Sequence, residues 1–269
     1  MREISPELAQ RVRYLKTAAK ADAEADQALA DTVADIIAGV RSEGDAAVAR
    51  YTRQFDGLDL SAFEVSMADR IAAVDGLDAT TRADTTFAIE QVRGFARAQR
   101  DTLAPLDIET LPGVHLGHRI RPIASVGCYV PGGRYPLLSA PIMSLVPAVV
   151  AGCREIVACL PPTAPETMVG ICHLAGATRI FRIGGAQAIA AMAYGTNSVP
   201  QVDKIMGPGN AFVNEAKRQV FGVLFIGVAW AAQLVHPGGA FTNVDSAVRG
   251  AVAVSHESAP SAVLRQDEA

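Results

Sequence analysis

The sequence predicts an α/β protein in which a helical N-terminal region precedes a parallel β-sheet with helices on both of its faces. In the first hundred residues, apolar side chains recur with helical spacing. From residue 125 onward, short apolar runs alternate with helical segments, and glycine-rich turns separate them. Strands that alternate with helices of roughly 10–15 residues are typical of βαβ units, whose strands run parallel.

The N-terminal region is expected to contain an amphipathic helix with one apolar stripe. That stripe follows the i, i+3, i+4, i+7 spacing and consists of Val33, Ile36, Ile37 and Val40. Because glycine often ends helices and aspartate often caps them, we expect Gly44 to end this helix and Asp45 to cap the next one.

Two more amphipathic helices are expected before residue 104. The apolar stripe of the first includes Val48, Tyr51 and Phe55. The second spans 78–100, and its apolar residues are Phe87, Val92 and Phe95. We interpret these helices as packing or dimerisation elements without a chemical role. After them, Pro105, Pro112 and Pro122 flank an extended segment, which we interpret as a linker.

Beyond this linker, four strands and four helices are expected to alternate. In chain order they are strand 125–130, helix 139–152, strand 155–160, helix 166–176, strand 179–183, helix 184–194, strand 204–206 and helix 211–220. Parallel sheets built in this way have both faces covered by helices.

Three glycine-rich turns each follow an expected strand and precede an expected helix. They are YVPGG (129–133), GGAQ (184–187) and GPGN (207–210). Ligands bind at the carboxyl ends of parallel strands, where glycine lets the backbone approach closely and a helix N-terminus offers free N–H groups. We therefore expect Tyr129, Gln187 and Asn210 to surround one shared site. The Gly-x-Gly-x-x-Gly and P-loop fingerprints are absent, so a nucleotide would bind without the usual diphosphate turn.

Composition and charge exclude several protein classes. Half of the 269 residues are hydrophobic, and 28 acidic against 24 basic residues give a net charge of −4. This balance argues against disorder and against a dedicated nucleic-acid binder. The longest apolar run, 223–235, is shorter than the roughly 20 residues of a membrane helix, and the N-terminus lacks the apolar core of a signal peptide. We expect a cytoplasmic protein without membrane or nucleic-acid partners.

The cysteines and most histidines are expected to lie outside any active site. Each cysteine sits alone in an apolar run, which indicates reduced core residues: Cys128, Cys153, Cys159 and Cys172. We expect His173 to be a core residue of a helix. The loop histidines are expected to be His115, His118 and His236.

Four segments resemble the histidinol dehydrogenase family. They are EGDAAVARYTRQFDG (43–57), SVGCYVPGGRYP (125–136), HLAGATRIFRIGGAQAIAAMAYGT (173–196) and VPQVDKIMGPGNAFVNEAKRQVFG (199–222). The resemblance implies a Rossmann-like domain in a zinc-dependent homodimer of histidine biosynthesis. Such an enzyme oxidises L-histidinol to L-histidine through an aldehyde, in two NAD-dependent steps. The family's NAD contacts fall on Tyr129, Gln187 and Asn210.

The contiguous Gly133-Arg134-Tyr135-Pro136 differs from the spacing usual in that family. This form is more similar to sulfopropanediol dehydrogenases of the same superfamily. The sequence therefore leaves two substrates open, the amino alcohol histidinol and a small sulfonated diol.

The resemblance is lost after Gly222 and returns near the end of the chain. VSHESAPSAVL (254–264) is similar to the family's zinc-ligand segment, so that His256 matches its histidine while Ala253 stands at its glutamine. One imidazole is fewer than the three protein ligands of a catalytic zinc. The family's remaining zinc ligands and its general base fall beyond Ala269, so no catalytic residue is assigned.

We therefore divide the chain into a helical N-terminal region (1–104), a Rossmann-like dinucleotide-side domain (105–222) and the divergent start of a second, incomplete domain (223–269). C-terminal truncation by a disrupted reading frame is our hypothesis for this pattern. The alternatives to an active dehydrogenase are a non-catalytic nucleotide-binding or dimerisation module and an unstable remnant.

Overall fold

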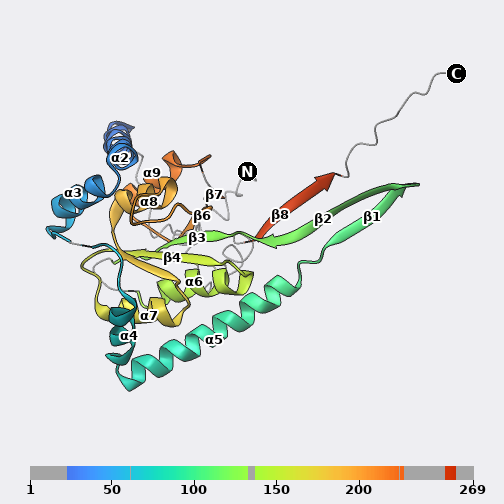
Figure 1. Ribbon diagram of the computed structural model, residues 1–269, viewed down its shortest axis with the longest axis horizontal. Coiled ribbons are helices and arrows are strands. Elements are labelled where there is room, and N and C mark those ends of the chain that lie inside the picture. Colours follow the sequence, from blue (N-terminus) through green and yellow to red (C-terminus); the bar gives the residue numbers. More distant parts are fainter. Residues whose placement is uncertain (1–22, 61, 133–136, 224, 227–251, 259–269) are drawn as a thin grey trace, which may run out of the picture.

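A computed structural model describes residues 23–60, 62–132, 137–223, 225–226 and 252–258 (Figure 1). Its centre is a five-stranded sheet in the order β5-β4-β3-β6-β7, and every neighbouring pair is parallel. In chain order the strands are β3 (Ser125–Tyr129), β4 (Glu155–Leu160), β5 (Arg179–Arg182), β6 (Lys204–Met206) and β7 (Phe225–Ile226). The predicted α/β fold with a parallel sheet is confirmed.

Helices cover both faces of this sheet (Figure 1). On one face lie α4 (Met67–Asp75), α5 (Ala79–Asp101), α6 (Ser139–Ala151) and α7 (Glu166–Leu174). On the other face lie α2 (Ala23–Glu43), α3 (Asp45–Asp56), α8 (Gly185–Tyr194) and α9 (Ala211–Gln219). Every expected strand and helix of the sheet region is present, with bounds within two residues of the prediction.

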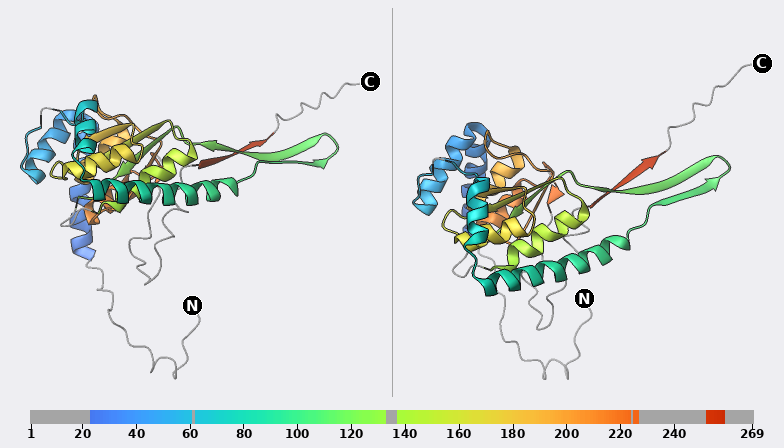
Figure 2. Two further views of the ribbon diagram at one scale, coloured as in Figure 1. Left: turned by 90° about the horizontal axis from the view of Figure 1, so that it is seen from below. Right: turned by 60° about the horizontal axis from the view of Figure 1, so that its bottom comes forward.

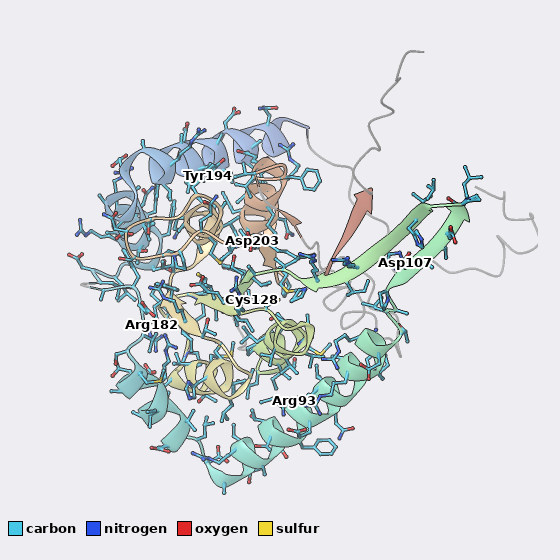
Figure 3. All side chains as sticks on the ribbon, turned by 45° about the vertical axis from the view of Figure 1, so that its right-hand side comes forward. Arg93, Asp107, Cys128, Arg182, Tyr194 and Asp203 are labelled. Carbon is cyan, nitrogen blue, oxygen red and sulfur yellow. The ribbon has the colours of Figure 1, made fainter. Side chains whose placement is uncertain are left out.

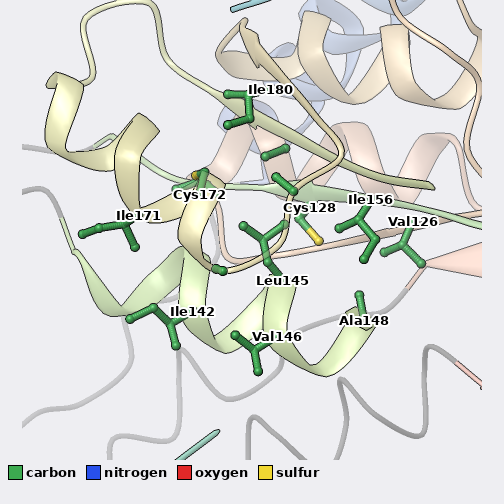
Figure 4. Packing of buried hydrophobic residues seen from close by; sticks show 14 of the residues in the cluster. Val126, Cys128, Ile142, Leu145, Val146, Ala148, Ile156, Ile171, Cys172 and Ile180 are labelled. Atoms are coloured by element: carbon green, nitrogen blue, oxygen red, sulfur yellow. The ribbon is translucent and has the colours of Figure 1, made fainter. Parts of the chain in front are cut away.

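Side chains of the central strands alternate between two buried clusters. Ile156 and Ala158 of β4 pack on the α6 side, whereas Val157 and Cys159 pack on the α8 side. This alternation follows from the two-residue period of a strand. Figure 4 shows Leu145 of α6 close to the sheet on the first of these faces. Because both clusters are apolar, the sheet is buried on both sides and its strand ends are fixed in place.

Two expectations about the N-terminal helices, one about a helix cap and one about a buried side chain, were wrong. The predicted stripe of α2 is buried throughout, but the N-cap of α3 is Gly44 and not Asp45. The Asp45 carboxylate instead accepts a hydrogen bond from Ser198 Oγ at 2.7 Å. Phe55, which was expected in the stripe of α3, is exposed, and the residues that α3 buries are Ala47, Val48 and Thr52.

Helix α5 forms as predicted, with Asp78 as its N-cap, but it presents a different face to the core. The buried residues are Thr85, Ile89 and Ala96, whereas Phe87 and Phe95 are exposed. Val92 is partly buried and packs against the core as expected, so the expected apolar face was wrong for Phe87 and Phe95. A helix in this position needs only small or branched residues to contact α6, so its largest side chains can lie outside the contact.

The expected linker is a β-hairpin that projects away from the sheet (Figure 2). Its strands are β1 (Leu106–Leu111) and β2 (Val114–Pro122), joined by Pro112 and Gly113. A third strand, β8 (Val252–Ser258), pairs antiparallel with β2. His115 and His118 therefore lie in a strand and not in a loop, which corrects the expectation for both.

All four cysteines are buried and outside any disulfide in the described part of the chain, as predicted, and Figure 3 labels Cys128 at the centre of the fold. Burial raises the pKa of Cys153 to about 11 and that of Cys172 to about 12, so these thiols stay protonated and unreactive at neutral pH. Among the described helices, none is long and apolar enough to cross a membrane. The cytoplasmic location and the domain boundaries after residues 104 and 222 stay predictions.

Candidate functional site

The three glycine-rich turns meet at the carboxyl edge of the sheet. Gly207, after β6, has φ +116°, and a Cβ placed on it would lie 2.1 Å from the carbonyl oxygen of Tyr129 at the end of β3. A Cβ on Gly132 would lie 2.8 Å from Pro161, and one on Gly184 would lie 3.3 Å from the same residue. Glycine is therefore required at position 207, and Gly132 and Gly184 allow the turns to lie close to Pro161.

A cavity of about 620 Å³ lies where these turns meet. Tyr129, Gln187 and Asn210 all line it, so the structure brings the three predicted site residues together. The remaining lining residues are Thr32, Ile36, Phe55, Asp56, Pro131, Gly132, Pro161, Gly184, Gly185, Ala186 and Phe212. A cavity of this size, mostly apolar with a few polar groups, is typical of a small-molecule site.

Tyr129 is buried and has one hydrogen-bonding function to spare. Its hydroxyl oxygen accepts a hydrogen bond from the Gly185 N–H at 3.2 Å, which leaves the hydroxyl proton available to a ligand. Burial raises the pKa of this phenol above its ordinary value, and the Gly185 hydrogen bond only partly opposes that rise. Tyr129 is therefore a neutral donor at physiological pH.

Gln187 holds a buried acceptor without a partner. The residue lies in the first turn of α8, and its side chain is 1% exposed. Among the described residues, no donor reaches its Oε1 atom. Leaving a buried amide oxygen unpaired costs about 1–3 kcal/mol, so an oxygen of this kind beside a cavity points to a ligand that donates to it.

Asn210 is the N-cap of α9 and is exposed. Its Oδ1 atom accepts a hydrogen bond from the Val213 N–H at 3.0 Å. This capping bond fixes the side chain at the mouth of the cavity. With the carbonyl oxygen engaged, the amide nitrogen Nδ2 is the group that remains for a ligand.

The N-terminal helices also contribute to the cavity wall, which our interpretation of them as packing elements did not foresee. Thr32 and Ile36 come from α2, and Phe55 and Asp56 come from the end of α3. Burial raises the pKa of the half-buried Asp56 carboxyl. The sequence signal that could have identified them is the segment 43–57, whose resemblance to the family ends in Phe55-Asp56-Gly57.

Lys217 supports the GPGN turn from inside the protein. Its side chain is 4% exposed, and its Nζ atom donates a hydrogen bond to the Gly207 carbonyl oxygen. Burial lowers the pKa of this ammonium group from 10.5 to about 8. The hydrogen bond from Lys217 therefore stabilises the turn, whereas burial of the positive charge on Lys217 lowers the free energy of unfolding.

The depressed pKa of Lys217 predicts that the contribution of this residue to stability rises with pH in alkaline solution. Between pH 8 and 10.5 the folded protein binds one proton fewer than the unfolded chain at this residue. The gain in unfolding free energy is complete above the pKa that Lys217 has in the unfolded chain. It is lost as the pH falls through the pKa that Lys217 has in the folded protein, and the whole change is about 3 kcal/mol. Urea unfolding from pH 7 to 11 should therefore show the wild type gaining about 3 kcal/mol of unfolding free energy relative to Lys217→Met, because the buried thiols and Lys204 contribute the same pH dependence to both proteins. Both proteins retain Lys204, so parallel curves would contradict the assignment to Lys217.

The described residues do not form a zinc site. They contain no group of three or more His, Cys, Asp or Glu side chains that could hold a metal ion. The backbone of His256 lies in β8 opposite His118 of β2, whose own Nε2 is 3.0 Å from the Ala104 carbonyl oxygen. His173 is only half-buried, and its Nδ1 atom has no partner among the described residues. His236 lies outside the described part of the chain.

Comparison with known proteins gives a consistent family relationship. The sequence model of the family described as histidinol dehydrogenase matches residues 19–232. The histidinol dehydrogenase homolog 1 of Mesorhizobium japonicum is 48% identical over 198 residues, which are 72% of this chain and 40% of that protein. The histidinol dehydrogenase of Escherichia coli K12 is 44% identical over 196 residues, which are 73% of this chain and 45% of that protein.

A solved structure supports the same relationship. The crystal structure of histidinol dehydrogenase from Elizabethkingia anophelis superposes with a TM-score of 0.70 at 31% identity. The match covers 80% of this chain and 48% of that one. The chain therefore spans less than half of the length of the relatives that it matches.

Proposed function

Because the chain belongs to the histidinol dehydrogenase family, we propose that it serves the NAD-dependent oxidation of L-histidinol to L-histidine through the aldehyde, and that its own part is to bind the dinucleotide. One observation carries this proposal. Tyr129, Gln187 and Asn210 converge on one cavity, and Gln187 keeps a buried oxygen there without a partner among the described residues.

The three side chains offer complementary hydrogen-bonding groups to NAD. Tyr129 donates its hydroxyl proton, Gln187 accepts at Oε1, and Asn210 donates from Nδ2. The N-terminus of α8 lies at the same cavity and favours the negative charge of the diphosphate. Bound NAD would supply the acceptor for a hydride from the alcohol carbon. The positioned base and the zinc ligands of the reaction are not assigned to any described residue.

Histidinol is the substrate that the comparisons favour over a sulfonated diol. The matching family and the relatives from Escherichia coli and Elizabethkingia anophelis carry the name histidinol dehydrogenase, whereas the relative from Mesorhizobium japonicum is named a homolog of it. The diol alternative depends on Gly133-Arg134-Tyr135-Pro136, and these residues lie outside the described part of the chain.

A homodimer is part of the proposal. The hairpin register places Ile108 opposite Leu116 and Leu106 opposite His118, so three exposed aliphatic side chains share one face of the hairpin with His118. An exposed apolar face on a projecting hairpin favours association with a second copy. Sedimentation velocity at micromolar concentration should give a particle of twice the chain mass; a monomer at all concentrations would contradict the dimer.

NADH binding to the protein and to Tyr129→Phe tests the function. We expect calorimetry to show binding to the wild type and about 10-fold weaker binding to the variant, because one hydrogen bond is lost. Tyr194→Phe is the matched control, since Tyr194 ends α8 outside the cavity. No binding to the wild type would refute the proposal. NADH formation from NAD, L-histidinol and zinc then tests whether this chain completes the reaction by itself.

A further inference from the structure

One wall of the cavity carries a carboxylate that the proposed contacts to NAD do not use. Asp56 is the last residue of α3, just before Gly57, whose left-handed conformation ends the helix. Within the described part of the chain, its carboxylate has neither a hydrogen-bond donor nor a cation as partner. It lies close enough to Tyr129 for its charge to contribute to the raised pKa of that phenol.

The charge of Asp56 restricts what can lie beside it. Among the described residues that line the cavity, it is the only side chain with a formal charge. A dinucleotide brings two negative phosphate groups, which an unpaired carboxylate repels. The neutral part of the ligand that suits a carboxylate is a ribose, because two adjacent hydroxyl groups can donate to its two oxygen atoms.

Two exposed phenylalanines indicate which ribose is placed there. Phe55 of α3 is 52% exposed and Phe212 of α9 is 44% exposed, although both line the cavity. Aromatic rings that stay uncovered beside a cavity offer flat apolar surfaces to a planar base. Asp56 and both rings line the same cavity, so we expect a base that packs on the rings to place its own ribose beside the carboxylate.

We propose that Asp56 is the specificity-determining residue of this cavity: its carboxylate accepts hydrogen bonds from the 2′- and 3′-hydroxyl groups of the adenosine ribose of NAD and repels the 2′-phosphate of NADP. This inference rests on the proposed function. An acidic side chain at the ribose is a general physical means of separating the two dinucleotides, because the added phosphate removes a donor and adds negative charge.

Calorimetry with NADH and NADPH tests the proposal in the wild type, Asp56→Asn and Asp59→Asn. Asp59 is the matched control because it is exposed, pairs with Arg53 and lies outside the cavity, while its replacement removes the same charge. We expect the wild type and Asp59→Asn to prefer NADH by about 100-fold. Asp56→Asn should bind NADH about 10-fold more weakly and should lose most of the preference. Asp56→Ser provides a second variant should the first fail to fold.

The outcomes distinguish a failure of the role proposed for Asp56 from a failure of the proposed dinucleotide binding. If the wild type binds NADH but Asp56→Asn retains the wild-type ratio of NADH to NADPH affinity, the role of Asp56 is refuted and the proposed function stands. An equal loss of affinity for both dinucleotides leads to the same conclusion. If the wild type binds neither dinucleotide, the proposed function is refuted and this inference falls with it.

Discussion

Gly207→Ala is expected to destabilise the protein by about 3–5 kcal/mol and to abolish dinucleotide binding. The new methyl group would stand 2.1 Å from the Tyr129 carbonyl oxygen, which belongs to the backbone of β3 and cannot rotate away. The φ of +116° adds strain for any residue with a side chain. The turn must move, and both the Lys217 hydrogen bond and the position of Asn210 depend on it.

Thermal unfolding and NADH calorimetry check this result against Gly113→Ala. Gly113 also has a positive φ, +78°, but no atom lies within 4 Å of a Cβ placed there. The control therefore carries backbone strain without the collision and should lose only about 1–2 kcal/mol, with binding unchanged. For the Gly207 variant we expect a melting temperature lower by about 10 °C. Equal effects of the two substitutions would show that the turns do not pack as described.

The convergence of Tyr129, Gln187 and Asn210 could be predicted because it depends only on how close each residue lies in sequence to the end of a strand. Tyr129 ends a recognisable strand, Gln187 and Asn210 follow theirs within a few positions, and the carboxyl ends of parallel strands share one edge of the sheet. Apolar runs and glycines mark these strand ends directly in the sequence. For the same reason, β4 and β6 have the bounds that were predicted for them.

The contributions of Phe55 and Asp56 could not be predicted from local pattern. Their place at the cavity depends on how α2 and α3 pack against α8 and α9, which are far away in sequence. The exposed Phe55 was assigned to the buried stripe because apolar character alone does not distinguish a core residue from one that faces a cavity. The hairpin was missed because its flanking prolines are equally typical of a linker and of strand ends.

Gln187→Met is expected to stabilise the unliganded protein by about 1–3 kcal/mol while weakening NADH binding at least 10-fold. Methionine has nearly the same length as glutamine and adapts to irregular space, so the packing of α8 is retained. The substitution removes a buried oxygen that has no partner among the described residues. It also removes the acceptor that the proposed site offers to the dinucleotide. Urea unfolding without ligand and calorimetry with NADH measure the two effects separately.

The matched control is Gln201→Met, because the amide of Gln201 is satisfied by a hydrogen bond from Nε2 to the Ala193 carbonyl oxygen at 2.9 Å. Removing a satisfied amide should lower the unfolding free energy by about 1 kcal/mol and leave binding unchanged. The two substitutions are chemically identical, so opposite signs in stability can only come from their surroundings. Added NADH should then raise the melting temperature of the wild type and of Gln201→Met but not that of Gln187→Met. If Gln187→Met destabilises the protein as Gln201→Met does, the Gln187 oxygen already has a partner in solution, and the unpaired acceptor no longer argues for a ligand.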